Sequence, residues 1–276
     1  MKNIVICAVA ASLMCMACDP LEDRDELKGS ITADQLNISA IPEIRDGVNS
    51  NYVILNSDGN PCLSSWDYGS GTLIGTGGRV QLLLTGDNEI IYTGLNPDGT
   101  KITKSLTVHI DRTYDVAPEW GLFCGSGEKV WKWDDQASAV WGNGGYLSNV
   151  APGWWTVPVG DMEGQTPGEG ANARMTFSLK GASLTKKKSD GGTESGTFAF
   201  DMSATTTNAG GDGLWGIGKL NTNRVTVLSG KQPNGGNAPV YSYDILKLTN
   251  SELVLGWPEP GAGAWGTAWY WLFRAE

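Results

Sequence analysis

Two short stretches predict the fold: residues 129–133 read Lys-Val-Trp-Lys-Trp, and residues 140–146 read Val-Trp-Gly-Asn-Gly-Gly-Tyr. In the first, apolar and charged residues alternate, which places Trp131 and Trp133 on one face of a strand and Lys132 on the other. In the second, Trp141 precedes a glycine-rich loop, where a ligand has close access to the backbone. Together they predict antiparallel β structure with large aromatic rings beside open turns.

The same pattern of short strands and turns extends over the whole chain. Its 276 residues include 38 glycines and 12 prolines, and the apolar residues come in short alternating runs interrupted by Asn, Asp and Gly. No amphipathic segment is long enough for three helical turns. We therefore predict an all-β fold. Eleven of the 12 tryptophans lie between Trp120 and Trp271, so the two halves of the chain differ in kind.

The first 17 residues have the pattern of a signal peptide, with a basic start, an apolar run from Ile4 to Met16 and a cysteine at position 18. The apolar run is too short to span a membrane. Cys15-Met16-Ala17-Cys18 resembles the lipobox of bacterial lipoproteins, although Cys15 stands where leucine is usual. The resemblance implies lipid attachment at Cys18. An ordinary secreted protein with a polar leader is the alternative.

Residues 18–30 are rich in Asp and Glu and form a predicted solvated tether. This acidic run is similar to the export signal of surface lipoproteins in Bacteroidetes. The resemblance implies a protein anchored by lipid in the outer membrane and exposed at the cell surface.

Charge and composition exclude several functions. The formal net charge of −10 argues against nucleic acid and anionic lipid as partners, and it favours a neutral ligand. His109 is the only histidine, so a Ser-His-Asp or Cys-His mechanism and a histidine-rich metal site are unsupported. We predict no cofactor and assign no metal site, and whether Asp58, Asp98 or the Asp134-Asp135 pair holds calcium is left open. Whether Cys62 and Cys124 form a disulfide is left open.

Residues 31–112 are predicted to form a small Greek-key sandwich, because strand patterns recur about every ten residues with a turn after each. The sequence Trp66-Asp67-Tyr68-Gly69-Ser70-Gly71 resembles the characteristic turn of polycystic-kidney-disease (PKD)-type immunoglobulin-like domains. That resemblance implies a spacer domain with Trp66 in its core and no ligand of its own. The polar, proline-ended residues 111–118 mark the boundary.

Residues 118–276 form a second predicted domain, rich in tryptophan. We predict a larger antiparallel β-sandwich or jelly roll, with a lipocalin-like barrel as the alternative. The end of the chain resembles lipocalin-like and jelly-roll domains of Bacteroidetes lipoproteins, and Trp269, Trp271 and Phe273 alternate toward the core. The predicted strands include residues 173–179, 184–187, 196–201, 215–220, 224–228, 241–248, 252–255 and 267–273.

The whole arrangement is similar to surface glycan-binding proteins encoded beside starch-utilisation-type importers. It implies a neutral polysaccharide or oligosaccharide and an outer-membrane importer complex as partners. The apolar face of a sugar ring stacks on indole, and Asp, Asn and Lys side chains bind its hydroxyl groups. Because Trp154 and Trp155 are adjacent, their rings would point to opposite faces of an extended strand, so we expect at most one of them in the core and the other as a candidate platform. The candidate carbohydrate-binding residues are Trp141, Tyr146, Trp154 and Trp155 as platforms, Asp134, Asp135 and Asn143 as polar partners, and Trp257 and Trp265 as a second rim.

Two other functions compete with glycan binding. A glycoside hydrolase needs two carboxylates, and the second domain offers several, including Asp161, Glu163, Asp201 and Glu259, but none lies in a recognisable catalytic motif. We therefore predict that the protein is not an enzyme. A structural or protein-binding lipoprotein subunit, with its indoles packed inside, is the principal alternative.

Overall fold

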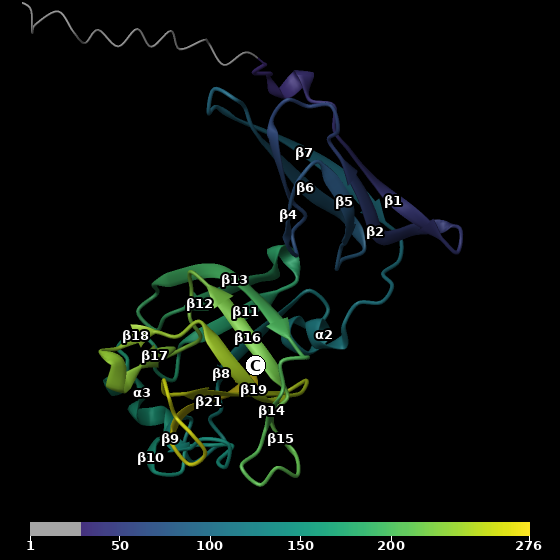
Figure 1. The fold of residues 1–276 in the computed structure, drawn as a ribbon. Helices are drawn as coiled ribbons and strands as arrows, with labels where there is room; N and C mark the ends of the chain where they lie inside the picture. The colour runs from purple at the N-terminus through teal and green to yellow at the C-terminus, as the bar shows by residue number, and fades with distance from the viewer. Residues whose placement is uncertain (1–28) are drawn as a thin grey trace, which may run out of the picture.

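The computed structural model describes residues 29–276, and it is all-β with two separate hydrophobic cores. The signal peptide, the lipidation site Cys18 and most of the acidic tether lie outside the described residues. Figure 1 shows the first domain in purple and blue above the larger second domain in teal, green and yellow. Within residues 29–276, no helix is long and apolar enough to cross a membrane.

The first domain contains two antiparallel sheets, ordered β1-β2-β5 and β4-β3-β6-β7. They enclose a core in which Trp66 and Tyr92 are fully buried and pack edge to face, with ring centroids 4.8 Å apart. Trp66 is therefore the core indole that the sequence predicts. The strands are β1 (Ser39–Arg45), β2 (Val48–Asn56), β3 (Leu63–Asp67), β4 (Thr72–Ile74), β5 (Gly77–Gln81), β6 (Gly86–Leu95) and β7 (Lys101–Ile110).

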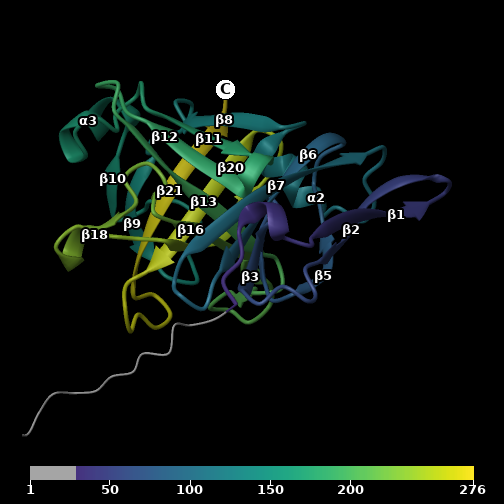
Figure 2. The same ribbon diagram turned by 90° about the horizontal axis from the view of Figure 1, so that it is seen from above.

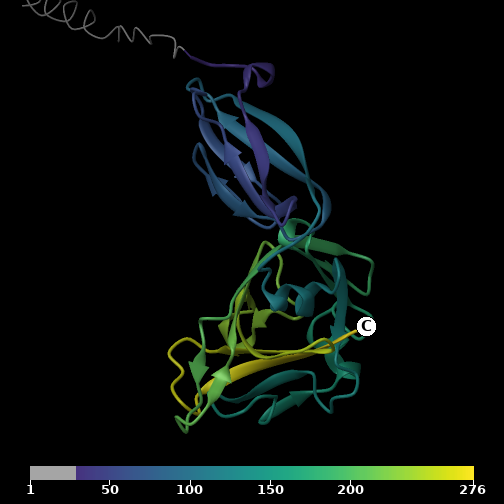
Figure 3. The same cartoon turned by 90° about the vertical axis from the view of Figure 1, so that its right-hand side faces the viewer.

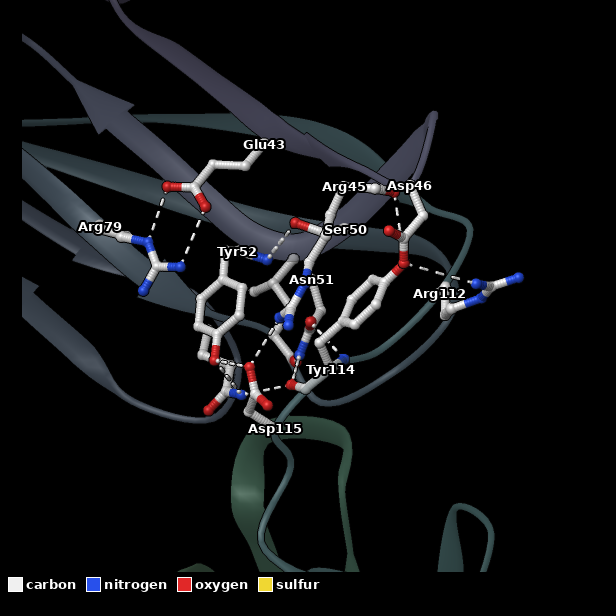
Figure 4. A network of polar contacts seen from close by, with 12 residues as sticks. Glu43, Arg45, Asp46, Ser50, Asn51, Tyr52, Arg79, Arg112, Tyr114 and Asp115 are labelled. Carbon is white, nitrogen blue, oxygen red and sulfur yellow. Dashed lines mark hydrogen bonds and ion pairs between the residues drawn. The ribbon is translucent and has the colours of Figure 1, made fainter.

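The segment between the domains is fastened to the first domain by polar contacts (Figure 4). The buried Asn51 amide donates to the carbonyl of Tyr114 at 3.2 Å and accepts from its N–H at 2.8 Å. The Asp115 carboxylate accepts from Arg45 at 2.8 Å and from the Tyr52 hydroxyl at 3.0 Å. The Arg45 hydrogen bond lowers the pKa of Asp115, which keeps this carboxylate charged.

The second domain forms a closed antiparallel barrel of eight strands, in the order β8-β11-β12-β13-β16-β19-β20-β21. Between them, Figures 1 and 2 label every strand of this ring. It closes because β21 pairs with β20 on one side and with β8 on the other, through Phe273 opposite Trp133. The predicted jelly roll is thus replaced by the barrel alternative. The ring strands are β8 (Glu128–Trp133), β11 (Arg174–Ser178), β12 (Ser183–Lys187), β13 (Thr193–Asp201), β16 (Gly218–Asn223), β19 (Ser242–Leu248), β20 (Glu252–Pro258) and β21 (Thr267–Ala275).

Two further strands extend this sheet, since β21 continues past β8 to pair with β9, and β9 pairs with β10. The predicted glycine-rich loop after Trp141 is therefore wrong, because residues 141–145 form strand β9. Short hairpins and helices complete the domain. They are β9 (Trp141–Gly145), β10 (Trp155–Val157), β14 (Thr206–Thr207), β15 (Leu214–Gly216), β17 (Lys231–Gln232), β18 (Ala238–Pro239), α2 (Pro118–Cys124) and α3 (Met162–Gln165).

The barrel interior is filled by indole rings and by loop segments that cross it. Residues 224–228, predicted as a strand, form none. Val225, Val227 and Leu228 are instead buried in the core. Three interior indoles donate to backbone carbonyls: Trp131 to Phe123, Trp133 to Glu169 and Trp271 to Ser229, at 2.9, 2.8 and 3.0 Å. These bonds satisfy buried N–H groups that would otherwise be costly.

The two domains touch directly. Leu83 and Leu84 follow the end of β5 and pack against the core of the barrel domain. A cavity of about 300 Å³ lies beside them, lined by residues 67–70 of the first domain and 179–181 of the second. Cys62 and Cys124 lie in the separate cores and are both buried and unpaired, so no disulfide links the domains.

Candidate carbohydrate-binding groove

The candidate site is a groove of about 400 Å³ between β9, β10, β21 and the β17–β18 hairpin. Cross-strand pairing builds its wall: Asn143 on β9 lies opposite Trp155 on β10 and opposite Trp269 on β21. Side chains of directly paired residues share a face of the sheet, so these three project to the same side. The groove is lined by Trp141, Asn143, Trp155, Gln165, Lys231, Pro233, Asn234, Asn237 and Trp269.

Three indoles form the aromatic part of the groove. The ring centroids of Trp141 lie 5.4 Å from those of Trp155 and 5.3 Å from those of Trp269, and Trp155 and Trp269 are 5.7 Å apart. Trp141 and Trp269 are almost completely buried, whereas Trp155 is 40% exposed. Trp141 and Trp269 therefore form the buried base of the groove, and Trp155 offers the open ring surface.

The Trp141 indole N–H is buried and has no hydrogen-bond partner within residues 29–276. Other interior indoles of the barrel domain, such as Trp131, Trp133 and Trp271, do have one. A buried donor without an acceptor is costly. Trp141, a residue of the groove lining, therefore carries a buried donor that no described group accepts.

The opposite wall carries cationic and amide groups. The Lys231 ammonium lies 5.4 Å from the Trp141 ring centroid and donates to the carbonyl of Gln165 at 2.6 Å. Burial lowers the pKa of Lys231, while the charge of Glu169 opposes that shift. Asn234 and Asn237 follow on the exposed hairpin. Amide groups both donate and accept hydrogen bonds, as sugar hydroxyls do.

Glu259 fixes the position of the two walls relative to each other. Its Oε1 accepts the Trp269 indole N–H at 2.9 Å and the Asn234 side-chain amide at 2.6 Å. One carboxylate therefore joins the barrel wall to the β17–β18 hairpin. Among the residues that the structure describes, none that lines the groove carries a carboxylate.

Two further exposed indoles lie just beyond the groove. Trp154 and Trp265 are 54% and 61% exposed, and both rings lie over Gly145 of β9. Neither Trp154 nor Trp155 is buried in the core, so the prediction that at most one of them is core holds, and both rings are open to solvent. The N–H groups of Gly153 and Trp154 both donate to the Asn143 carbonyl, so regular strand alternation begins only at Trp155.

The other predicted site residues lie elsewhere. Asp134 and Asp135 do not reach the groove, because they follow β8 and Asp135 pairs with Lys132 and Arg274 at 2.7 and 3.1 Å. Tyr146 packs edge to face on Trp215 in a separate cluster. Trp257 is half-buried opposite Trp269 in the β20–β21 ladder.

Sequence reasoning missed Gln165, Lys231, Asn234 and Asn237, and it assigned Trp269 to the core alone. Gln165 ends α3, Lys231 begins β17, and Asn234 and Asn237 lie between β17 and β18. None of the four belongs to a motif, and only the folded domain brings them to the indoles. The one available signal was the Gly- and Asn-rich character of residues 230–237. Within residues 29–276, no group of three or more potential metal ligands occurs.

Fold and site together define a class: an all-β protein whose closed barrel carries an aromatic groove with amide walls. Comparison of the sequence with models of known protein families and with curated proteins gives no match.

Proposed function

We propose that this protein is a non-catalytic surface lipoprotein that binds a neutral polysaccharide or oligosaccharide in the groove of Trp141, Trp155 and Trp269. The observation that carries the proposal is the gathering of exposed indoles at one site. The three most exposed tryptophans are Trp154, Trp155 and Trp265, and all lie on or beside β9 and β10. Large exposed apolar rings that cluster mark a binding surface.

The chemistry of the lining supports a sugar as the ligand. An indole stacks against the C–H face of a pyranose ring, and such aromatic contacts contribute about 1 kcal/mol beyond the buried area. Asn143, Gln165, Asn234 and Asn237 offer amide donors and acceptors for hydroxyl groups. A groove with one or two stacking rings and several amides is suited to affinities of roughly micromolar to millimolar.

Binding without hydrolysis is proposed because the carboxylates near the groove have other roles. Glu259 accepts hydrogen bonds from Trp269 and Asn234. Glu169 and Glu194 are both paired with Lys186, at 2.6 and 3.0 Å. A glycosidase requires one carboxylic acid and one carboxylate facing the scissile bond.

The domain arrangement supports a capture role at a surface. The groove elements β9 and β10 lie at the end of the molecule farthest from the first domain (Figures 1 and 3). With a PKD-type spacer and a lipid on Cys18, as the sequence resemblance implies, the groove faces away from the outer membrane. We propose that it hands glycan to an importer complex in that membrane.

A structural or protein-binding subunit is the second candidate. Apolar side chains on the first domain favour it, since the paired residues Ile41 and Ile54 are 61% and 42% exposed and Ile74 is 84% exposed. Exposed apolar side chains of this kind fit a protein partner better than a sugar.

The test is binding of the folded protein to a panel of soluble glycans: β-glucan, xyloglucan, mannan and host-type oligosaccharides. Calorimetry and tryptophan fluorescence measure affinity, and a reducing-sugar assay runs in parallel. We expect Trp155→Ala to weaken binding about tenfold, equivalent to 1.4 kcal/mol, with little change in melting temperature. Leu214→Ala, which removes another exposed apolar side chain, is the control. No binding across the panel would transfer the proposal to the protein-binding candidate, and sugar release would establish an enzyme.

A further inference from the structure

Trp265 combines two unfavourable features. Its φ angle is +64°, in the left-handed region that favours glycine, and its side chain is 61% exposed. The residue lies in a turn closed by the Gly266 N–H and the Gly263 carbonyl, at 2.8 Å. Glycine is the residue that such a turn position prefers. Neither the backbone nor the core explains an indole here, and strained backbone of this kind concentrates at functional sites.

The position of the ring is nevertheless well defined. The Trp265 N–H donates to the Tyr146 carbonyl at 3.0 Å, and the Tyr146 N–H donates to the Gly266 carbonyl at 2.7 Å. These reciprocal bonds hold the turn against the end of β9. A Cβ atom at Gly145 would lie 2.8 Å from Trp265 Cε3 and 3.4 Å from Trp154 Cζ2. Both rings therefore occupy the space that glycine leaves open.

This pair of rings lies on the same face of β9 as the groove. Residues 141, 143 and 145 alternate to one side of the strand, and Trp141 and Asn143 line the groove. Two residues along a strand span about 7 Å. That separation exceeds one sugar ring, so the rings over Gly145 cannot stack on the sugar that occupies the groove.

We infer that Trp154 and Trp265 form a second stacking site in line with the groove, and that the ligand is an extended glycan chain spanning both sites. The inference rests on the proposed function and specifies its substrate class. Sugars in the middle of a chain occupy the two sites together. Linking two weak sites in one ligand raises the affinity by making the second contact intramolecular.

The length of the oligosaccharide is the variable that tests the second stacking site. The probes are cello-, manno- and xyloglucan-derived oligosaccharides with two, four and six main-chain sugars. For the wild-type protein we expect affinity to rise at least tenfold from the shortest to the longest member of the series that binds.

Trp265→Gly is the decisive variant, because glycine adopts the positive φ without strain and the melting temperature should stay the same or rise. It should bind the shortest oligosaccharide as the wild type does and lose most of the gain with length. Gly145→Ala, which displaces Trp265, should act in the same direction. Trp155→Ala should weaken binding at every length.

The outcomes separate the two proposals. Equal length dependence in the wild type and in Trp265→Gly, with Trp155→Ala still impaired, overturns the second site and leaves the groove intact. If Trp155→Ala and Trp265→Gly both bind as the wild type does, the groove and the second site are overturned together. The same holds if the wild-type protein binds none of the probes.

Discussion

The buried ion pair between Lys186 and Glu169 provides the sharpest stability prediction. The Lys186 ammonium lies 2.6 Å from Glu169 and 3.0 Å from Glu194, and it donates to the Thr226 hydroxyl at 3.2 Å. The side chains of Lys186 and Glu169 are only 3% and 6% exposed. The Glu169 carboxylate also accepts the backbone N–H of Ser229, in the segment that crosses the barrel. Lys186→Met keeps the aliphatic volume and removes the charge.

The expected loss in the free energy of unfolding follows from the charged group that remains buried in Lys186→Met. Glu169 stays buried with one backbone donor and without its cation, and breaking a buried pair in this way costs about 3–5 kcal/mol. For a domain of this size each kcal/mol corresponds to roughly 2–4 °C, so the melting temperature should fall by about 10 °C. Ser229 precedes the groove hairpin, so glycan affinity should fall as well.

Urea unfolding followed by tryptophan fluorescence measures this effect, because most of the indoles lie in the barrel domain. Lys188→Met is the matched control, since Lys188 pairs at 2.5 Å with Glu194, which is 40% exposed. Such a surface pair contributes at most about 1 kcal/mol. Combining Lys186→Met with Glu169→Gln removes the orphaned charge and should restore about half of the loss. If Lys186→Met costs no more than Lys188→Met, the reasoning about burial is wrong.

Three further predictions concern single groups. The hydrogen bond between His109 and Asp87, 2.6 Å long, raises the pKa of His109. The contact therefore stabilises the fold fully below about pH 6.5 and less as the pH rises through the raised pKa. Asp87→Asn should lower the pKa of His109, which proton NMR of this sole histidine measures. Burial raises the pKa of the Cys124 thiol to about 12, so iodoacetamide should modify it only in urea, as peptide mass spectrometry would reveal. Glu259→Gln weakens a charge-assisted acceptor of the Trp269 indole and should lower both the unfolding free energy by about 1 kcal/mol and the glycan affinity, with unchanged affinity as the contrary result.

Local patterns were enough to predict the all-β class and most strands. Alternation placed Trp131 and Trp133 on one face of a strand and Trp269 and Trp271 toward the core, and all four are buried. This works because a strand with one face in a core must repeat every two residues.

Closure of the barrel was beyond sequence reasoning, because it depends on contacts between distant residues. Phe273 pairs with Trp133 across about half of the chain, and nothing local encodes that choice. Residues 224–228 have the apolar pattern of a strand, yet they fill the interior of a ring that other strands close. A short apolar run reports burial and leaves its backbone partner undetermined.

The site was predicted in part for the same reason. Trp141, Asn143 and Trp155 come from one glycine-rich region, and the groove does contain them. Asp135 is equally polar and nearby in sequence, but Lys132 and Arg274 engage it elsewhere. Lys231 enters the groove from a hairpin about 90 residues away, which only the folded barrel brings there.

The polar contacts that fasten the interdomain segment to the first domain (Figure 4) have a mechanical consequence. Tension applied between an anchored N-terminus and a glycan held at the far end must pass through residues 111–117. Two strands, β1 and β2, hold this segment through hydrogen bonds of Arg45, Asn51 and Tyr52. Their partners are Tyr114 and Asp115, so the load is shared in parallel across several bonds. The joint should therefore resist twisting, and the groove should keep its orientation while the chain is pulled.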